Sequence, residues 1–272
     1  MADVHSTTIT EGDVELAEGV VIGPHCVLDG SKGPIRIGAG TMLRGHVHLQ
    51  GPLTMGARNL LWPFVCLGFA PQSVSFDVHK AGHGLVIGEA NRFREHVTIH
   101  RAMTDEGPTR VGDRNYFMAG SHAGHDCQIG CDCVFANVTL LAGHVRVEDR
   151  VITGGSSAAH QFVQLGRGAF ISGSTGAAHD VPPWFTQTGT NFIGSINIVG
   201  LRRSGAGTEA IEQVKWVFKT LYRRGLSPAR ALQTLRERAA EPTISEYIRF
   251  IERSKRGLTP GRSQRLRGAG GD

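Results

Sequence analysis

The sequence predicts a parallel β-solenoid followed by a helical region, and three observations support this prediction. An apolar or small residue recurs at every sixth position from Val111 to Ala177, and a period this short is typical of a solenoid. Beyond residue 200 the apolar residues instead fall three or four apart, which indicates amphipathic helices. The chain also contains 37 glycines in 272 residues, as expected for a fold with many corners.

Six residues accommodate one short strand and one corner. The repeat residue and the residue four places later then both point inward, and three such sides close a triangular coil of about eighteen residues, with parallel strands about 4.8 Å apart in successive coils. The same repeat occurs at 16–28, 37–67 and 87–99. It is interrupted at 69–85 and 102–109, which we expect to be loops that leave the coil, and such loops often contain functional residues.

Three helices are expected in the last quarter of the chain. The first begins at Thr208 and ends before Gly225, a residue type that commonly terminates helices. The second has Ser227 as its N-cap and Pro228 at its first position, and the third spans about 243–254. We therefore divide the chain into a solenoid domain, 1–200, a helical domain, 201–258, and a tail, 259–272, whose glycine- and arginine-rich end predicts disorder.

Charge is distributed unevenly between these parts. Residues 1–200 contain 13 Lys and Arg against 17 Asp and Glu, a net charge of −4, whereas residues 201–272 contain 16 against 7, a net charge of +9, and the two sum to +5. The basic part lacks interleaved aromatic residues and any nucleic-acid-binding motif, so we expect no nucleic-acid partner. Two interpretations of this basic part remain: it binds an acidic carrier protein, or it is simply a helical face exposed to solvent.

The compartment follows from what the chain lacks. Residues 1–12 do not have the layout of a signal peptide, and no stretch is apolar enough to span a membrane, so we expect a cytoplasmic protein without stable membrane insertion. Among the five cysteines, Cys127 and Cys133 fall at inward positions and Cys131 at a corner. Their sulfurs are therefore expected to point in different directions, which predicts core packing and no metal site.

Histidines gather along one predicted edge of the solenoid. A step of eighteen residues moves one coil along the same wall, so the following residues are expected at one edge: His100, His122, His125, Gly143, His144, His160, Gln161 and His179. Corner positions are expected to face outward, where a neighbouring chain could meet them. With Asp126 next to His125, this cluster predicts a proton-transfer site in which a histidine deprotonates a substrate hydroxyl and Asp126 orients it.

The chain resembles a known family in both its repeat and its motifs. The repeat resembles that of the hexapeptide-repeat transferases, whose fold is a left-handed parallel β-helix, here with a C-terminal α-helical domain. Five strings are similar to the acyl-(acyl-carrier-protein)–UDP-N-acetylglucosamine O-acyltransferases of lipid A biosynthesis: 98–101 (Thr-Ile-His-Arg), 121–127 (Ser-His-Ala-Gly-His-Asp-Cys), 141–145 (Leu-Ala-Gly-His-Val), 160–162 (His-Gln-Phe) and 180–183 (Asp-Val-Pro-Pro). The resemblance extends over nearly the whole chain.

The resemblance implies an activity and a set of site residues. It implies transfer of an (R)-3-hydroxyacyl group from acyl carrier protein to the 3-hydroxyl of UDP-N-acetylglucosamine, without a cofactor, a metal or a covalent intermediate, by a homotrimer with active sites between subunits. His125 would be the general base, Asp126 its orienting partner, and the Gly143 N–H the oxyanion donor. The residues implied in substrate binding are Asp77, His79, Lys80, His100, His122, His144, His160, Gln161, Gly173, Asn197 and Arg203.

The chain departs from the family pattern at several positions. His79 stands where the family commonly has a lysine, and Lys80 follows it. The segment 190–198 is shorter and differently composed, and Val199 occupies a position that can be acidic, which leaves the nucleotide contacts there open. Gly173 falls at the position by which the family determines the length of its acyl-chain pocket. A glycine there leaves room for a longer acyl chain, but the length of that chain is not determined.

Three other interpretations remain open. The sister N-acyltransferase of the same pathway usually has an extra N-terminal domain, whereas here the repeat begins by Leu16. A zinc-dependent carbonic anhydrase on the same prism would require converging histidines, for which His96, His100, His122 and His125 are available. A non-catalytic scaffold would not require the histidine cluster. Whether the acceptor is a hydroxyl or an amino sugar is also left open.

Overall fold

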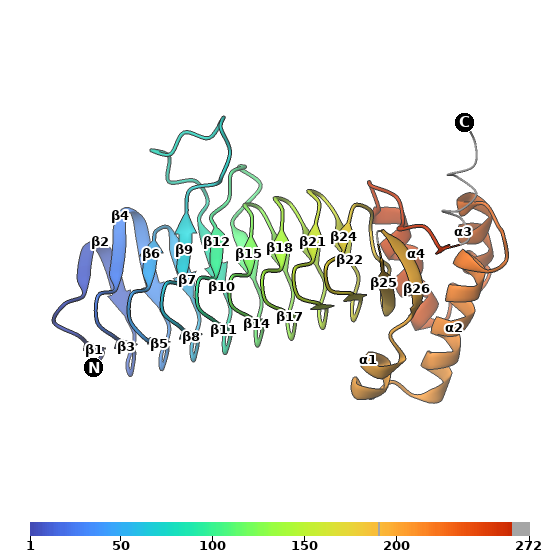
Figure 1. Cartoon of the computed structure of the whole chain (residues 1–272), viewed down its shortest axis with the longest axis horizontal. Coiled ribbons are helices and arrows are strands. Elements are labelled where there is room, and N and C mark those ends of the chain that lie inside the picture. The colour runs from blue at the N-terminus through green and yellow to red at the C-terminus, as the bar shows by residue number, and fades with distance from the viewer. Residues whose placement is uncertain (190, 263–272) are drawn as a thin grey trace.

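The computed structural model describes residues 1–189 and 191–262, and it consists of an elongated parallel β-solenoid that is capped at its C-terminal end by four α-helices (Figure 1). The strands form two hydrogen-bonded sheets of 11 and 15 strands. The smaller sheet is the first wall of the prism. The larger sheet forms the second and third walls, because β4 (Val27–Ile37) pairs with β6 at one end and with β7 at the other.

The strands of each wall follow one another along the solenoid. The smaller sheet contains β1 (Asp3–Val4), β3 (Val21–Ile22), β5 (Met42–Leu43), β8 (Leu60–Leu61), β11 (Arg92–Phe93), β14 (Tyr116–Phe117), β17 (Val134–Phe135), β20 (Ile152–Thr153), β23 (Phe170–Ile171), β25 (Phe185–Thr188) and β26 (Phe192–Ile196). The second wall contains β2 (Ile9–Leu16), β4, β6 (His48–Gln50), β9 (Cys66–Phe69), β12 (Thr98–His100), β15 (His122–Ala123), β18 (Leu140–Leu141), β21 (Ala158–Ala159) and β24 (Gly176–Ala177). The third wall contains β7 (Leu53–Met55), β10 (Leu85–Ile87), β13 (Thr109–Val111), β16 (Gln128–Ile129), β19 (Arg146–Val147) and β22 (Gln164–Leu165).

The strand register confirms the predicted coil of eighteen residues. Phe117 pairs with Phe135, and Phe135 pairs with Thr153, always in parallel. From Val111 to Ala177 the repeat residues are buried, and so are the residues four places later, such as Ser121. Phe93, Phe117 and Phe135 stack in the interior with ring centroids 5.2 and 4.6 Å apart. Burial of each such ring stabilises the fold by about 1.5–3 kcal/mol.

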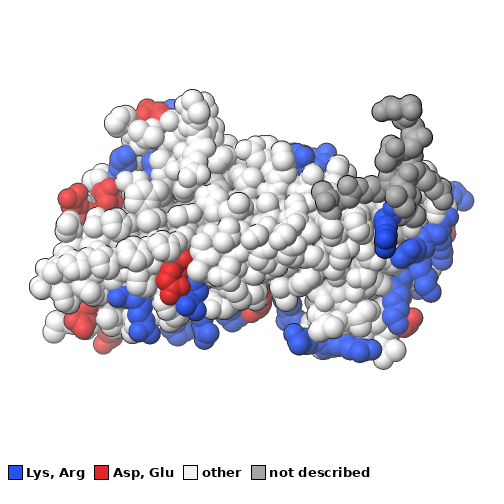
Figure 2. All heavy atoms as spheres, in the orientation of Figure 1, with Lys and Arg blue, Asp and Glu red and all other residues white. Residues whose placement is uncertain are grey.

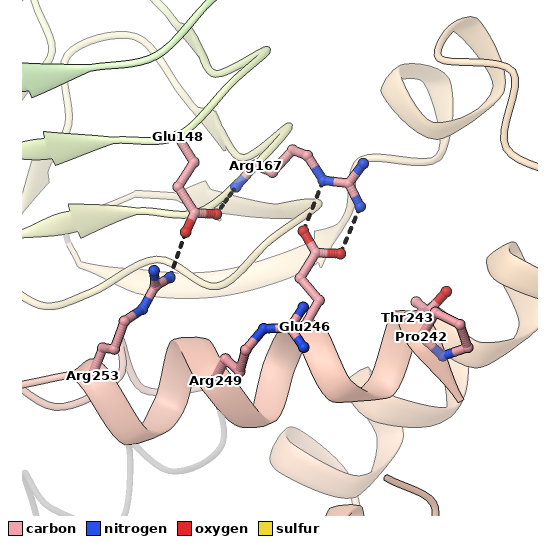
Figure 3. Close-up of a pocket in the computed structure, with 7 residues that line it drawn as sticks. All are labelled: Glu148, Arg167, Pro242, Thr243, Glu246, Arg249 and Arg253. Carbon is pink, nitrogen blue, oxygen red and sulfur yellow. Dashed lines mark hydrogen bonds and ion pairs between the residues drawn. The ribbon is translucent and has the colours of Figure 1, made fainter. Parts of the chain in front are cut away.

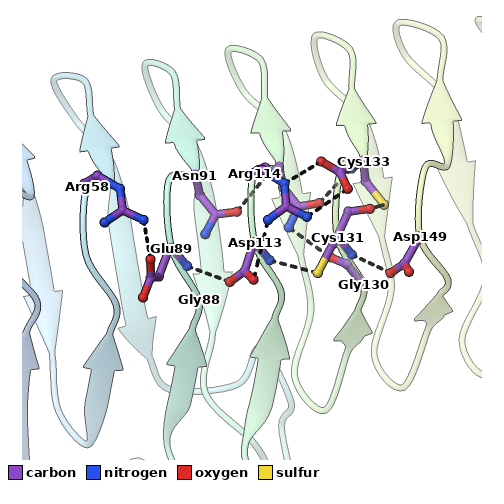
Figure 4. A network of polar contacts seen from close by, with 12 residues as sticks. Arg58, Gly88, Glu89, Asn91, Asp113, Arg114, Gly130, Cys131, Cys133 and Asp149 are labelled. Carbon is purple, nitrogen blue, oxygen red and sulfur yellow. Dashed lines mark hydrogen bonds and ion pairs between the residues drawn. The ribbon is translucent and has the colours of Figure 1, made fainter. Parts of the chain in front are cut away.

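Polar ladders support the corners next to the first wall (Figure 4). Buried Asn91 accepts the backbone N–H of Asn115 at 2.8 Å, and Asn115 in turn accepts that of Cys133 at 2.8 Å. At the neighbouring corner, Cys131 Sγ accepts the N–H of Asp113 at 3.2 Å, whereas Cys133 is buried. Cys127 is also buried, so Cys127 and Cys133 lie in the core and Cys131 at a corner, as the register predicts.

The two interruptions of the repeat are loops that project from the second and third walls (Figure 1). The longer loop follows β9 and ends at β10, and the shorter one lies between β12 and β13. Fully buried Arg101 holds the base of the longer loop, because its guanidinium donates to Gln50 Oε1 at 2.7 Å, to Gly68 O at 3.0 Å and to Lys80 O at 2.9 Å. The predicted positions of both loops are confirmed.

The helices are α1 (Ile198–Arg203), α2 (Thr208–Tyr222), α3 (Pro228–Arg236) and α4 (Pro242–Arg253). The last three confirm the predicted helices, and Ser227 caps α3 by accepting the N–H of Arg230 at 3.3 Å. Neither α1 nor the antiparallel pairing of β25 with β26 was predicted from the sequence. Within the described residues, none of the helices is both long and apolar enough to cross a membrane.

The helices close the end of the solenoid through an aromatic cluster, in which Phe185 lies 5.4 Å from Phe218 and 5.4 Å from Tyr247 between ring centroids. Ion pairs add to this contact, since Arg167 binds Glu246 and Arg253 binds Glu148, each at 2.6 Å (Figure 3). Lys and Arg side chains gather on the visible face of the helical end (Figure 2).

The prediction that the chain is disordered from residue 259 onward is wrong for residues 259–262. Thr259 is fully buried, its N–H donates to Asp180 O at 2.8 Å, and its hydroxyl donates to His179 O at 3.1 Å. The chain returns to the solenoid here because these bonds satisfy backbone groups that the end of the last coil leaves open. Residues 263–272 lie outside the described residues.

Candidate active site

The candidate site lies at the corner between the second and third walls. Asp126, His144 and Phe162 occupy this corner in three successive coils, and all three have left-handed backbone conformations, with φ of 59°, 61° and 66°. The coils are joined directly here, because the His144 N–H donates to His125 O at 2.9 Å. The tight corner therefore fixes the direction of the side chains on either side of it.

His125 and Asp126 form a hydrogen-bonded dyad, in which Nδ1 of the imidazole lies 2.7 Å from Oδ2 of the carboxylate. An ionised carboxylate can only accept a hydrogen bond, so Nδ1 carries the hydrogen. Nε2 then has a free lone pair and is the atom that can take a proton from a substrate. The dyad has the arrangement expected of a general base and its orienting partner.

The shorter loop holds Asp126 in its charged form. Met103 N–H donates to Oδ2 at 3.1 Å, and Oδ1 accepts the N–H of Thr104 at 3.1 Å and its hydroxyl at 2.8 Å. Burial alone would raise the pKa of Asp126, but the hydrogen bonds from His125 and Thr104 outweigh it and hold this pKa well below its ordinary value. The carboxylate therefore stays charged next to the base.

The expectation that the corner histidines face outward is wrong for His100 and His125. Only 7% of His100 and 9% of His125 is exposed, and Asp126 is buried to the same degree as His125. The physical reason is the shorter loop, which covers this corner through the bonds of Met103 and Thr104 to Asp126. The dyad is partly removed from water within a single chain.

Two further histidines flank the dyad. The rings of His125 and His144 are perpendicular at 5.1 Å, and Nε2 of His144 lies 3.8 Å from Oδ2 of Asp126. His144 also stacks on Phe162 with centroids 4.5 Å apart. Burial lowers the pKa of His144, and the nearby Asp126 charge opposes this effect. His144 thus lies beside the dyad with its ring fixed by the phenyl group.

His100 and His122 form the deeper side of the cluster, with ring centroids 4.9 Å apart. Nδ1 of His122 lies 2.8 Å from the hydroxyl of Thr98. Burial lowers the pKa of His100 to about 4, with further contributions from His122 and His125, and burial also lowers the pKa of His122. Both rings therefore favour the neutral form, which can donate and accept hydrogen bonds.

Gly143 lies against the imidazole of His125, as the eighteen-residue register predicts. A Cβ atom at this position would lie 2.6 Å from Cε1 and 2.7 Å from Nε2 of His125. Among the described residues, Ala142 and His144 donate their N–H groups to Ala159 O and His125 O, whereas Gly143 N–H has no acceptor within the chain. This N–H is therefore available beside the reactive nitrogen.

Other predicted site residues lie elsewhere on the chain. His160, Gln161 and Gly173 are exposed on coils beyond His144, and Asp77, His79 and Lys80 are exposed in the longer loop, where the His79 N–H donates to Asp77 Oδ1 at 3.0 Å. Asn197 caps α1 by accepting the N–H of Gly200 at 2.9 Å, and Arg203 is the exposed last residue of this helix. Among the described contacts, none joins these residues to His125 or Asp126.

A groove of about 850 Å³, which was not predicted from the sequence, includes Asp126 of the dyad in its wall. Asp126 and His144 line it at the corner, and residues 252–255 at the end of α4 line its end nearest the helices. Arg110 and Arg146 lie on the third wall, one coil before and one coil after Gln128, so Arg110 is on the side of the Asp126 coil that is away from the helices. The register could have revealed this arrangement, because 110 and 146 differ by two coils, but these arginines belong to none of the motifs that resemble the family.

The ligand atoms of His125, Asp126 and His144 lie within 4.8 Å of one another, which is close enough for a shared metal ion. However, both oxygens of Asp126 already accept hydrogen bonds from Met103, Thr104 and His125. A metal ion would have to displace the bond that orients His125. The arrangement therefore fits proton transfer better than metal binding.

Comparisons with known proteins agree over nearly the whole chain. The family profile described as UDP N-acetylglucosamine O-acyltransferase, domain 2, matches residues 180–259. An acyl-(acyl-carrier-protein)–UDP-N-acetylglucosamine O-acyltransferase of Thermodesulfovibrio yellowstonii is 38% identical over 95% of this chain and 99% of its own. The solved UDP-N-acetylglucosamine acyltransferase of Francisella novicida has a TM-score of 0.87 at 32% identity, over 97% of this chain and 94% of its own. That of Moraxella catarrhalis has a TM-score of 0.88 at 33% identity, over 94% and 99%. The predicted left-handed parallel β-helix with C-terminal helices is confirmed.

Proposed function

Because the chain belongs to the acyl-(acyl-carrier-protein)–UDP-N-acetylglucosamine O-acyltransferase family, we propose that it transfers an (R)-3-hydroxyacyl group from acyl carrier protein to the 3-hydroxyl of UDP-N-acetylglucosamine. This is the first step of lipid A biosynthesis in the family. The observation that best supports the reaction is the His125–Asp126 dyad lying against Gly143, which places a base and a backbone donor side by side.

His125 acts as the general base in this proposal. Its Nε2 removes the proton of the sugar hydroxyl while the hydroxyl oxygen forms a bond to the thioester carbonyl carbon. The tetrahedral intermediate then collapses, the C–S bond breaks, and His125 returns the proton to the departing thiolate of the carrier. Asp126 stabilises the imidazolium, and a positioned general base typically accelerates such a step by about 10²–10⁴-fold.

The Gly143 N–H stabilises the oxyanion of that intermediate. Within the described residues it has no other acceptor, and it is adjacent to the ring that must stand next to the reacting carbon. One such donor typically contributes about 3 kcal/mol to transition-state stabilisation. His122 and His144 line the pocket around it, and the neutral ring of His122 suits hydrogen bonding to a sugar.

A homotrimer would complete the site. His160, Gln161, Gly173, Asn197 and Arg203 do not reach the dyad within one chain, although the family resemblance implies that they contact substrate. A neighbouring copy that faces this corner could supply them, together with Asp77, His79 and Lys80 from the longer loop. Light scattering on fractions that are assayed in parallel tests this proposal, and a fully active monomer would contradict it.

The reaction is tested by following a radiolabelled 3-hydroxyacyl group from acyl carrier protein to UDP-N-acetylglucosamine. We expect wild-type protein to form product and His125→Ala to lose at least about 10²-fold in turnover. His25→Ala is the matched control, because His25 is an exposed corner histidine on an early coil. Equal activity of His125→Ala and wild type would exclude His125 as the base.

The absence of a covalent intermediate has a separate test. Wild-type protein is mixed with acyl carrier protein that bears the acyl group, without the acceptor, and its intact mass is measured. We expect no added acyl mass, because the proposed base deprotonates the acceptor and forms no bond to carbon. An acyl adduct on the protein would contradict this mechanism.

We also propose that catalysis resides in residues 1–200 and carrier docking in residues 201–258, in a cytoplasmic protein. Residues 201–258 contain 13 Lys and Arg against 6 Asp and Glu, and this net charge of +7 suits an acidic carrier; the five cysteines are free, as is usual in a reducing compartment. Cell fractionation tests the location. The affinity of acyl carrier protein for the full-length protein, measured at increasing salt concentrations, tests the docking.

A further inference from the structure

The longer loop projects from the solenoid and has no core of its own (Figure 1). From residue 72 to residue 83 none of its residues is buried, and Val74 is fully exposed. A segment that buries so little is held mainly by hydrogen bonds to the body of the protein, and it opens readily without them. The bonds that fix this loop therefore determine where Asp77, His79 and Lys80 lie.

Arg101 fastens both ends of this loop to the solenoid. Its guanidinium donates to Gly68 O at 3.0 Å, just before the loop leaves the second wall, and to Lys80 O at 2.9 Å, near the point where the loop returns. In the middle of the loop, the ring centroid of Phe76 lies 5.8 Å from the guanidinium carbon, within the range of a cation–π contact. One side chain thus contacts the beginning, the middle and the end of the loop.

The orientation of Arg101 is itself fixed by polar contacts. Arg101 is fully buried, and a buried charge is costly unless its donors are satisfied. Its guanidinium donates to Gln50 Oε1 at 2.7 Å, and Gln50 Nε2 donates to Asp29 Oδ2 at 2.9 Å. A carboxylate therefore supports the buried cation through one intervening side chain, and the guanidinium is held in one orientation.

Lys32, in β4, holds the same loop from an earlier coil. Its Nζ donates to Val78 O at 2.7 Å. Within the loop, the Lys80 N–H donates to Asp77 O at 3.0 Å, so the four residues from Asp77 to Lys80 form one turn, here called the loop turn. Lys32 bonds the second residue of the loop turn and Arg101 bonds its last residue. The loop turn is therefore held at two points.

Arg101 also ties the loop turn to the dyad, because it begins the segment that holds Asp126. Met103 and Thr104, two and three residues later, donate their N–H groups to the Asp126 carboxylate at 3.1 Å each. The last residue of the loop turn and the orienting partner of the base are thus bound by the same short segment, 101–104. The position of the loop turn is set relative to the dyad by this segment.

We propose that Arg101 and Lys32 are positioning residues that hold the loop turn in the conformation in which it binds UDP-N-acetylglucosamine. This inference rests on the proposed function, in which side chains of the loop turn contact substrate. The acceptor fits the chemistry of these side chains, because a carboxylate accepts hydrogen bonds from sugar hydroxyls and an ammonium group binds phosphate oxygens. Arg101 and Lys32 act through the loop, since both donate to its backbone carbonyls.

Trypsin measures this clamp without any substrate. Lys80 is the only lysine or arginine from residue 59 to residue 91, and Arg101 bonds the carbonyl oxygen of the peptide that trypsin cleaves there. We expect cleavage after Lys80 to be at least about 10-fold faster in Arg101→Met and in Lys32→Met than in wild type, because cleavage requires the loop to open. Arg114→Met is the matched control, because Arg114 bonds Asp132 at 2.8 Å at the corner between the third and first walls, away from both loops. Equal cleavage rates in all four proteins would overturn the proposal.

Kinetics connect the clamp to substrate binding. In Lys32→Met we expect the KM for UDP-N-acetylglucosamine to rise by about 10-fold, while kcat and the KM for the acylated carrier stay within about 3-fold of wild type. The reason is that Lys32 bonds the loop and not the segment 101–104. Arg101→Met should show the same rise in KM together with a lower kcat, since its segment holds Asp126. If Arg101→Met does not fold, Lys32→Met tests the proposal alone.

A direct contact between Lys32 and the nucleotide is distinguished in a variant that lacks the side chains of the loop turn, Asp77→Ala, His79→Ala, Lys80→Ala. Adding Lys32→Met to this variant should not raise its KM further. A further rise would mean that Lys32 binds the nucleotide itself and would overturn the proposal. Faster cleavage of Lys32→Met with unchanged KM values, or a raised KM for the carrier alone, would overturn it as well.

Binding separates this inference from the proposed function. If wild type transfers no acyl group, the proposed function fails, and calorimetry with UDP-N-acetylglucosamine then takes the place of KM. Weaker binding by Lys32→Met than by wild type and Arg114→Met would still support the clamp. Equal binding by all three proteins, or no binding by wild type, would overturn it.

Discussion

Asp126 accepts a hydrogen bond from His125 at 2.7 Å while its own backbone adopts a left-handed conformation with φ of 59°. The two properties are connected, because the left-handed corner turns two adjacent residues so that their side chains meet. Asp and Asn are among the few types other than glycine that adopt this conformation readily. The corner thus allows a carboxylate where most other side chains would be strained.

Replacement of Asp126 by Asn keeps the corner and removes the charge. We expect Asp126→Asn to fold, since Asn tolerates the left-handed backbone, but with a lower melting temperature, because its NH2 group cannot accept the hydrogen bonds that one carboxylate oxygen accepts from Met103 or Thr104. Its turnover should fall by about 10²–10⁴-fold, because an amide neither stabilises the imidazolium nor fixes the tautomer with Nε2 as acceptor. Steady-state kinetics at several pH values measure this, and turnover within 3-fold of wild type would remove Asp126 from the mechanism.

Gly143 is predicted to tolerate no side chain. In Gly143→Ala the added methyl would lie 2.6 Å from His125 Cε1, so the imidazole must move away from the reactive position. We expect kcat to fall by about 10²-fold or more with little change in melting temperature. Gly176→Ala is the control, because a Cβ at Gly176 meets no atom within 4 Å. If both variants are equally active, the contact between Gly143 and His125 has no catalytic importance.

The sequence was most informative where the six-residue period holds. Burial of Phe117 and Ser121, the contact of Gly143 with His125 and the loops at 69–85 and 102–109 all follow from that period. It could not show that the shorter loop folds back, because the bonds from Thr104 to Asp126 join residues outside the register. The burial of His125 was therefore missed.

Elements without a period were also missed. The β25–β26 pair begins where the repeat has ended, and α1 is a single short helix whose cap, Asn197, is also bound to the solenoid through Gly168 O at 3.0 Å. Such elements are determined by tertiary contacts more than by local preference. The return of Thr259 to Asp180 has the same origin, since it depends on a backbone edge some eighty residues away.

Gly168 is predicted to be a critical position for stability. It has φ of 64°, and a Cβ there would collide with the ring of Trp184. We expect Gly168→Ala to lower the free energy of unfolding by about 2–3 kcal/mol, of which about 1 kcal/mol comes from the backbone conformation. Gly205→Ala measures the backbone contribution alone, because Gly205 has φ of 81° and open space around it. Denaturant unfolding of both variants should show the larger loss for Gly168→Ala; equal losses would mean that the Trp184 contact adjusts freely.

Removal of metal ions should leave the activity unchanged. The oxygens of Asp126 are occupied by donors from the chain, so a metal ion at His125, Asp126 and His144 would compete with the dyad. We expect turnover after dialysis against a chelator to match that of untreated protein, and elemental analysis to find less than about one tenth of an equivalent of zinc. Loss of activity that returns with added zinc would favour the zinc-dependent interpretation of this site.

His100 should make the fold sensitive to mild acid. In the unfolded chain its pKa is about 6.5, whereas burial in the fold lowers the pKa to about 4, so between these values the unfolded state binds more protons. The free energy of unfolding should therefore fall as the pH drops from 6.5 to 4, with a contribution from His100 of at most about 3 kcal/mol. His100→Phe keeps an aromatic ring next to His122 and removes the titration, so its stability should depend less on pH in this range. His25→Phe, at an exposed position, should follow the wild-type curve, and identical curves for His100→Phe and wild type would show that His100 is not the group responsible.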